Sequence, residues 1–241
     1  WTLAGATVGA SPLIGINFVG TQSFNVGVTT VTYTATDGAG NTAICSYTIT
    51  ILDTQFPVIV CPANIVQAND PGVCDAVVVY VAPVGTDNCP GPVTIQTAGL
   101  PSGSNFPVGV TTNTFQVTDA SGNVTTCSFT VAVNDTELPA IACPANIVQA
   151  NDAGVCGATI VYVAPIGTDN CPGAVTIQTA GLPSGSVFPV GVTTNTFEVT
   201  DASGNTSSCS FTVTINDTEL PVIACPAAIV QANDAGVCGA T

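Results

Sequence analysis

The sequence repeats itself with a step of 82 residues, and this feature constrains its fold more than any other. The segment CPANIVQAND begins at Cys61 and again at Cys143, and CPAAIVQAND begins at Cys225. Residues 55–136 and 137–218 differ at 17 of 82 positions, and seven of these differences are Val/Ile, Thr/Ser or Val/Ala exchanges that preserve shape. Such a chain is expected to fold as a tandem array of one small unit, in which repeat number matters more than any unique residue.

The repeat divides the chain into four segments. Residues 55–136 and 137–218 are complete units, residues 1–54 match the later part of a unit, and residues 219–241 match the beginning of one. Residues 1–23 depart from the pattern, so the first unit is a diverged copy. Since half of a β-domain cannot bury a core, the sequence predicts further units on both sides of this stretch.

Each unit has the pattern of an all-β domain. Four runs rich in β-branched and aromatic residues predict strands: Ala76–Ala82, Val93–Thr97, Thr111–Thr118 and Ser128–Val133. Clusters of Gly, Pro, Asn and Asp separate these runs and predict turns. About seven short strands in about 80 residues match an immunoglobulin-like β-sandwich, so we expect tandem sandwiches of this kind.

The composition argues against several classes of function. The chain has 15 acidic side chains but no Lys, Arg or His, which gives a net charge of −15 at pH 7. Nucleic-acid binding relies on cationic side chains, and an anionic membrane surface would repel this chain. The usual general base and every cationic stabiliser of a transition state are missing, so only paired carboxylates or an activated Cys remain as candidate catalytic groups. No apolar run reaches the roughly 18 residues that would predict a membrane span.

Several ordered motifs in each unit resemble those of the hyalin repeat (HYR) module. They are P-x-I-x-C-P at 57–62, P-x-x-TDN at 83–88, S-x-FPVG-x-TT at 104–112 and TDASGN-x-x-TCSFTV at 118–131. Such modules have an immunoglobulin-like fold and occur in extracellular proteins. These include very long surface adhesins of Bacteroidota that serve gliding motility and are exported by the type IX secretion system. The resemblance implies an extracellular, adhesive or architectural role without catalytic activity.

Four cysteines per complete unit, in a chain of this kind, predict two disulfide bonds per unit. The diverged first unit keeps Cys45, the equivalent of Cys127, but has Thr7 in place of Cys89. If the cysteine at the Cys127 position bonded to the one at the Cys89 position, Cys45 would have no partner in its own unit. We therefore expect each unit's first strand to be tied to its last, by the bonds Cys61–Cys127 and Cys143–Cys209.

The second bond of each unit is less constrained. The remaining cysteines predict the bonds Cys74–Cys89 and Cys156–Cys171. In an immunoglobulin-like sandwich, however, Cys74 lies at one end of the second strand and Cys89 beyond the other end, about 26 Å away. A disulfide allows at most about 7 Å between Cα atoms. Either the loop at 83–92 folds back, or Cys74 bonds to the next unit. Pairing Cys61 with Cys74 and Cys89 with Cys127 is a further alternative.

The acidic residues recur in register at the ends of the units. In an immunoglobulin-like domain, the loop after the second strand and the last hairpin turn share the end at which the chain enters. We therefore expect an oxygen cluster at each junction: Asp53, Asp87 and Asp119 at one, and Asp135, Glu137, Asp169 and Asp201 at the next. Such clusters suit Ca²⁺, which takes about six to eight oxygen ligands and would stiffen the junction. The alternative is that Asp and Asn only shape turns there.

Two further groups of residues invite a functional interpretation. Thr54, Thr136 and Thr218 follow aspartates at the junctions, and these Asp-Thr pairs loosely resemble O-glycan acceptor sites of Bacteroidota. The alternative is that they are turn residues. Tyr80 and Tyr162 are expected in the core rather than on a sugar-binding platform.

Together these features predict a stalk segment of a long extracellular, cell-surface filament or adhesin. Disulfides would act as staples, Ca²⁺ is the only candidate cofactor, and other repeats of the same chain are the expected partners. A surface polysaccharide or a solid surface is the expected adhesion target, and neither nucleic-acid binding nor membrane insertion is expected. A carbohydrate-binding repeat array and a self-assembling extracellular fibre are the alternatives.

Overall fold

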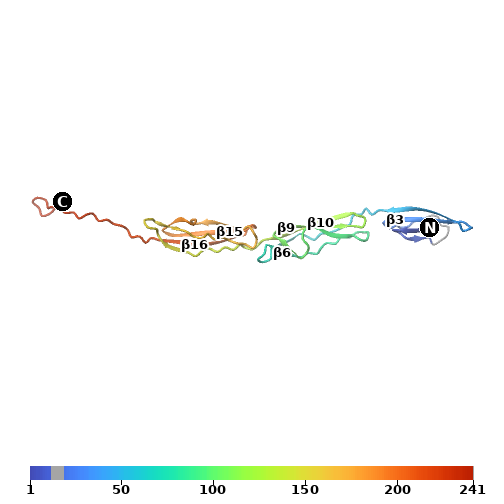
Figure 1. Ribbon diagram of the computed structural model, residues 1–241, viewed down its shortest axis with the longest axis horizontal. Helices are drawn as coiled ribbons and strands as arrows, with labels where there is room; N and C mark the ends of the chain where they lie inside the picture. The colour runs from blue at the N-terminus through green and yellow to red at the C-terminus, as the bar shows by residue number, and fades with distance from the viewer. Residues whose placement is uncertain (12–18, 241) are drawn as a thin grey trace. The chain divides into compact units, whose positions relative to one another are not determined.

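The chain is described by a computed structural model that covers residues 1–11 and 19–240, and it divides into two compact units, Trp1–Asp135 and Thr136–Thr241. The described residues contain strands and turns but no helix, so the all-β prediction is confirmed (Figure 1). The first unit holds β1 (Thr2–Gly5), β2 (Gly9–Ala10), β3 (Gly27–Thr36), β4 (Thr42–Ile51), β5 (Ile65–Ala68), β6 (Asp75–Val78), β7 (Val93–Ala98), β8 (Ser104–Pro107), β9 (Gly109–Thr118) and β10 (Val124–Asn134). The second unit holds β11 (Ile147–Ala150), β12 (Gly157–Ile160), β13 (Val175–Ala180), β14 (Ser186–Pro189), β15 (Gly191–Thr200) and β16 (Thr206–Asn216).

The complete repeat of the first unit is a two-layered β-sandwich. One layer is a four-stranded sheet in the order β5-β10-β9-β7, and the other is the antiparallel pair β6-β8. The long strands β9 and β10 are antiparallel neighbours, whereas β5 joins β10 in parallel, with Ile65 opposite Val131. The second unit repeats this arrangement with β11-β16-β15-β13 and β12-β14. The predicted immunoglobulin-like sandwich is thus confirmed.

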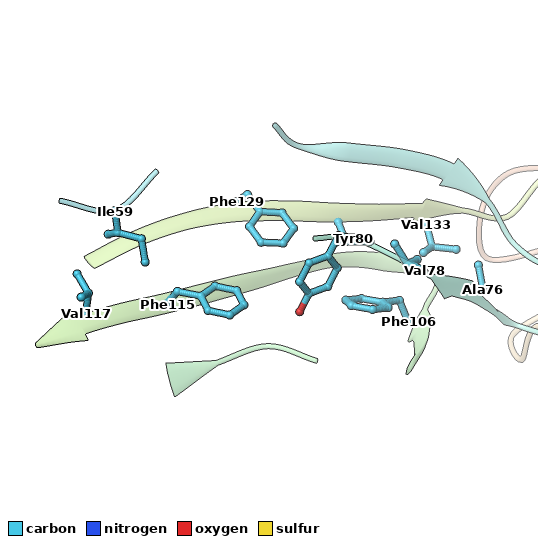
Figure 2. Packing of buried hydrophobic residues seen from close by; sticks show 10 residues of the cluster. Ile59, Ala76, Val78, Tyr80, Phe106, Phe115, Val117, Phe129 and Val133 are labelled. Atoms are coloured by element: carbon cyan, nitrogen blue, oxygen red, sulfur yellow. The ribbon is translucent and has the colours of Figure 1, made fainter. Parts of the chain in front are cut away.

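The core lies between the two layers, and aromatic rings fill its centre. Tyr80 packs edge-on against Phe129, with 5.0 Å between ring centroids, and more distantly against Phe115. Figure 2 shows these rings together with Phe106, which is fully buried. Tyr80 is 8% exposed and its equivalent Tyr162 is 9% exposed, as expected of core residues.

The apolar run at 76–82 forms a strand only over its first residues, because β6 ends at Val78. Beyond that point the backbone N–H of Tyr80 donates to Oγ of Ser102 at 2.8 Å, and the same hydroxyl donates to the carbonyl of Tyr80 at 2.6 Å. A side-chain hydroxyl thus satisfies the backbone groups that a neighbouring strand would otherwise pair. This contact explains why the strand is shorter than the predicted Ala76–Ala82.

The described residues of the two incomplete segments form no such two-layered core. The described part of residues 1–54 forms one four-stranded sheet in the order β2-β1-β3-β4. Most side chains of β4 are exposed, since no second sheet covers them among the described residues. Residues 217–240 are exposed and form no strand.

Gly99 marks a tight approach between backbone and side chain. Its φ is +85°, and a Cβ built there would lie 1.8 Å from Oδ1 of the fully buried Asn113. That oxygen is already occupied, because it accepts a hydrogen bond from the backbone N–H of Leu100 at 2.7 Å. Only glycine therefore fits both the backbone conformation and the space at this position.

We expect Gly99→Ala to lower the free energy of unfolding of its repeat by about 2–3 kcal/mol, because a steric clash adds to backbone strain. Gly103→Ala is the matched control, since Gly103 has a φ of +84° but a Cβ there would meet no atom within 4 Å. Urea unfolding of both variants separates the clash from the strain. Equal losses of stability would contradict the proposed clash.

Candidate functional site

Two disulfide bonds tie the first strand of each complete repeat to the last strand. They are Cys61–Cys127 and Cys143–Cys209, each with 5.6 Å between Cα atoms. The parallel pairing of β5 with β10 explains the first bond, because it places the segment before β5 beside the beginning of β10. Both bonds have the pairing expected from the sequence, and the first excludes the alternative bonds of Cys74 to Cys61 and of Cys89 to Cys127.

The second predicted bond of each repeat is wrong. Cys89 and Cys156 are free thiols, whereas Cys74 and Cys171 are disulfide-bonded, so neither Cys74–Cys89 nor Cys156–Cys171 forms. The carbonyl of Cys74 accepts a hydrogen bond from the backbone N–H of Val108, the residue just before β9. Cys89, by contrast, lies near Asp119, in the turn that follows β9. A strand of ten residues spans about 30 Å, far more than the roughly 7 Å that a disulfide allows between Cα atoms.

The end of the repeat at which the chain enters, here called the leading end, brings two predicted carboxylates together. One oxygen of Asp53, one of Asp87 and the sulfur of Cys89 lie within 4.8 Å of one another. An isolated bridge between Val58 and Thr86 holds the two segments side by side, with two N–H···O bonds of 2.8 Å. The cluster therefore combines the linker with the loop at the leading end.

Asp53 is the carboxylate of this cluster with an unused oxygen. Its Oδ1 accepts a hydrogen bond from the backbone N–H of Gln55 at 3.1 Å, whereas its buried Oδ2 has no N–H or O–H donor among the described residues. The thiol of Cys89 faces Asp53, and hydrogen bonding to this carboxylate, burial and its charge raise the pKa of Cys89. Cys89 therefore stays protonated at neutral pH. Since a thiol is a weak donor, the charge of Asp53 remains poorly compensated.

Asp119 is used differently, because its oxygens are occupied within its own hairpin turn. They accept hydrogen bonds from the backbone N–H groups of Ser121 and Asn123, at 2.9 and 2.8 Å, and from the Asn123 side chain at 2.8 Å. Burial opposes ionisation of Asp119, but these bonds outweigh it and lower the pKa. The Asn123 amide also donates to the carbonyls of Asp53 and Gln55, at 3.3 and 3.2 Å. Asp119 thus holds the leading segment indirectly, through Asn123.

The second complete repeat carries the equivalent turn and loop. Asp201 accepts hydrogen bonds from Ser203 and Asn205, and its pKa is lowered against the opposing effect of burial. Asp169 accepts a hydrogen bond from the backbone N–H of Cys171 at 2.8 Å. The local turn chemistry therefore recurs from one repeat to the next.

The remaining predicted site residues lie at the segment boundaries. Asp135 is the last residue of the first unit and is buried, and Glu137 is half-buried. The candidate glycosylation residues Thr54, Thr136 and Thr218 are exposed. Exposure makes these threonines accessible, and their glycosylation stays a prediction.

Comparison with known families decides what this repeat is. The model of the HYR domain matches residues 4–51, 52–133 and 134–215. The chain belongs to the HYR domain family. These limits begin the two complete repeats three residues earlier than the sequence periodicity does, so Asp53 belongs to the same HYR domain as Asp87.

Two curated relatives cover most of the chain. It is 39% identical over 226 residues to Hyalin of Strongylocentrotus purpuratus, and 37% identical over 214 residues to Hyalin of Lytechinus variegatus. These matches cover 89% and 85% of the chain but 19% and 40% of the relatives, so the HYR array spans less than half of either protein.

A more distant relative is the Serine-rich adhesin for platelets of Staphylococcus aureus. It is 32% identical over 151 residues, which cover 52% of this chain and 6% of that protein. Among the described residues of the HYR array, no helix is long and apolar enough to cross a membrane.

Proposed function

We propose that this HYR array is a mechanical, non-catalytic stalk segment of an extracellular, cell-surface adhesive protein. The observation that carries the proposal is the covalent closure of each complete repeat between its first and last strands. The Cys61–Cys127 bond bridges a separation of 66 residues within a repeat of 82. A pull on the two ends of the repeat therefore meets a covalent bond before it can unravel the sandwich.

The strand order supports the same role. The chain enters the repeat before β5 and leaves it after β10, and these strands are parallel neighbours. A pull on both ends acts along the strands and strains their hydrogen bonds together instead of opening them one by one. The Hyalin and adhesin relatives support an adhesive, extracellular setting, and disulfide bonds persist in such oxidising compartments.

Single-molecule force spectroscopy tests the stalk proposal. While the bond is intact, it keeps a loop of 66 of the repeat's 82 residues closed. Unfolding a complete repeat should therefore release only the other 16 residues, or about 55 Å of chain. Reduction should raise the length of chain released by each repeat to about 280 Å, less the length that the folded repeat already spans, because all 82 residues then extend. Extension without resolved unfolding steps under either condition would contradict a mechanical role.

The leading-end cluster extends the proposal to Ca²⁺. The carboxylates of Asp53 and Asp87 approach each other, the buried Oδ2 of Asp53 has no N–H or O–H donor among the described residues, and the chain has no Lys, Arg or His to neutralise them. We propose that these two carboxylates hold a Ca²⁺ ion, which would supply the compensating charge and fix the linker to the loop. Asp119 is not required as a ligand, because its own turn occupies its oxygens.

We expect chelation with EDTA to lower the melting temperature and Ca²⁺ to restore it. The stabilisation should reach about 2.7 kcal/mol when Ca²⁺ is 100-fold above its Kd. Asp53→Asn should remove the Ca²⁺ dependence from the transition of its own repeat. Asp75→Asn changes the charge equally at the opposite end of the repeat and should retain the dependence. Identical melting curves with EDTA and with Ca²⁺ would refute the metal site.

The adhesive target is part of the same proposal, and we expect a surface polysaccharide or a solid surface. The structure gives less support to an array of carbohydrate-binding sites, because the tyrosines of the complete repeats, Tyr80 and Tyr162, are buried in the cores. Self-assembly into fibres, gliding motility and type IX export stay predictions from the sequence.

A further inference from the structure

The turn between β5 and β6 contains the only Asp–Pro peptide bond of the chain, Asp70–Pro71. The corresponding bond of the second complete repeat is Asp152–Ala153. An aspartate carboxylate can attack the carbonyl carbon of its own residue, because this closes a five-membered ring. The nitrogen of proline is a tertiary amide without N–H, and once protonated it leaves readily. Asp–Pro is therefore the peptide bond most easily broken in acid, and only the first complete repeat contains one.

The turn directs a hydrogen-bond donor at the carbonyl that would be attacked. The backbone N–H of Val73 donates to the carbonyl oxygen of Asp70 at 3.2 Å. The backbone N–H of Asp70 itself donates to the carbonyl of Asp75 at 2.8 Å, which holds the two arms of the turn together. Because negative charge develops on a carbonyl oxygen when a nucleophile adds to its carbon, the N–H of Val73 stabilises the transition state of such an attack.

The carboxylate of Asp70 is held in place by one of its two oxygens. Oδ2 accepts a hydrogen bond from the backbone N–H of Val77 at 2.9 Å, whereas Oδ1 accepts none among the described residues. Asp70 is half-buried and Pro71 is exposed, so water reaches the bond between them. The turn thus combines a nucleophile with a free oxygen, a donor to the developing oxyanion and access for water.

The charged groups of the elements that meet at this turn are all acidic. Asp75 begins β6, and Asp135 follows β10, whose last residue Asn134 accepts a hydrogen bond from the backbone N–H of Asn69 at 2.9 Å. β5 has no charged residue, and the chain has no Lys, Arg or His, so no cationic side chain neutralises the attacking carboxylate. Negative surroundings also favour the proton that the leaving proline nitrogen must take up.

We propose that the Asp70–Pro71 bond is a self-cleaving site in acid. One carboxylate oxygen of Asp70 attacks the carbonyl carbon of the same residue and forms a C–O bond, which closes a cyclic anhydride. The C–N bond to Pro71 breaks, and its electron pair takes up a proton, so that proline leaves as an amine. A water molecule then opens the anhydride and restores Asp70 with a free α-carboxyl group. Overall, one peptide bond and one water molecule are consumed, and nothing is oxidised or reduced.

A cut at this position does not separate the two parts of the chain. It lies between Cys61 and Cys127, whose disulfide bond joins residues 1–70 to residues 71–241. β5 and β10, which lie on opposite sides of the cut in sequence, are also paired as parallel neighbours. The cut therefore opens one turn and leaves the disulfide closed. Its mechanical meaning rests on the stalk function proposed above, because a pull would still pass through the disulfide and bypass the cut.

Incubation of the 241-residue chain in dilute formic acid tests for this cleavage by mass spectrometry. Without reductant, the mass should rise by that of one water molecule while the chain stays in one piece. Reduction should then release residues 1–70 and 71–241, and N-terminal sequencing of the larger fragment should begin at Pro71. A chain that stays uncut, or whose fragments separate without reductant, would overturn the proposal.

The second complete repeat supplies a control within the same molecule. The carbonyl of Asp152 accepts a hydrogen bond from the backbone N–H of Val155 at 3.0 Å, and its Oδ2 accepts one from that of Thr159 at 2.9 Å. The nitrogen that would leave there belongs to Ala153 instead of a proline. We expect cleavage of the Asp–Pro bond to be at least about tenfold faster than cleavage of Asp152–Ala153. Equal rates at the two bonds would refute the role of the proline.

Two variants identify the reacting groups. Pro71→Ala copies the residue of the second complete repeat and should slow the cut to the rate at Asp152–Ala153. Asp70→Glu keeps the charge but would have to close a larger ring, so we expect it to slow the cut by about tenfold or more. A cut that continues at the original rate in Asp70→Glu would exclude attack by this carboxylate.

The same incubation in urea separates the role of the turn from the general lability of Asp–Pro bonds. The folded chain should be cut several-fold faster than the unfolded one, because unfolding removes the Val73 N–H from the carbonyl of Asp70. Equal or faster cleavage in urea would refute the role of the turn, as would loss of the β-sheet signal in circular dichroism before the cut. Since force spectroscopy reports on the unfolding of whole repeats, failure of this cleavage would leave the stalk proposal standing.

Discussion

Replacing both Cys61 and Cys127 by alanine is expected to lower the free energy of unfolding of their repeat by about 4 kcal/mol. The bond closes a loop with a sequence separation of 66, and its removal gives the unfolded chain back the conformational freedom that this closure withholds. Both cysteines also pack against the core, so the variant loses some packing as well. Small domains have a total stability of about 5–15 kcal/mol, and the repeat would become marginal.

Differential scanning calorimetry of the 241-residue chain measures this loss. The variant should show one transition at a much lower temperature, while the transition of the other complete repeat stays near its original position. Cys156→Ala is the control, because it removes an exposed free thiol and should change the free energy of unfolding by less than about 0.5 kcal/mol. A loss below about 1 kcal/mol in the double variant would show that the repeat does not depend on its staple.

Much of this architecture could be predicted from the sequence, because near-identical repeats restrict the possible folds. The β-branched run that predicted a strand at Thr111–Thr118 lies within β9, where alternate residues such as Phe115 and Val117 are buried. The pairing of Cys61 with Cys127 was predictable because the diverged first unit keeps Cys45, the counterpart of Cys127, but has Thr7 in place of the counterpart of Cys89.

The remainder depended on contacts between residues distant in sequence. Sequence reasoning inferred a wide separation of Cys74 from Cys89 from the length of the predicted second strand, but it left open whether the loop at 83–92 folds back. In the structure the two cysteines lie near opposite ends of β9. The role of Asn123 was missed, because its amide acts on Asp53, 70 residues away. The recurrence of asparagine in the TD-x-x-GN turn of all three copies was the available signal.

Truncating Phe106 should be as damaging as breaking the disulfide. This side chain is fully buried beside Tyr80 and Val78, and Phe→Ala changes in such cores cost about 3–5 kcal/mol through lost burial and an unfilled cavity. Phe188 occupies the equivalent position of the second complete repeat, in a separate core cluster. Phe188→Ala should therefore produce a similar loss in the other repeat.

Phe56→Ala provides the control for this prediction, because Phe56 belongs to the same HYR domain but is 62% exposed. We expect that variant to lose less than about 0.5 kcal/mol. Hydrogen exchange read by mass spectrometry locates each effect, since Phe106→Ala should speed exchange in β9 and β10 and leave β15 and β16 protected. If Phe106→Ala instead deprotected all four strands equally, the two complete repeats would unfold as one cooperative body, and the separate cores would not act as separate units of stability.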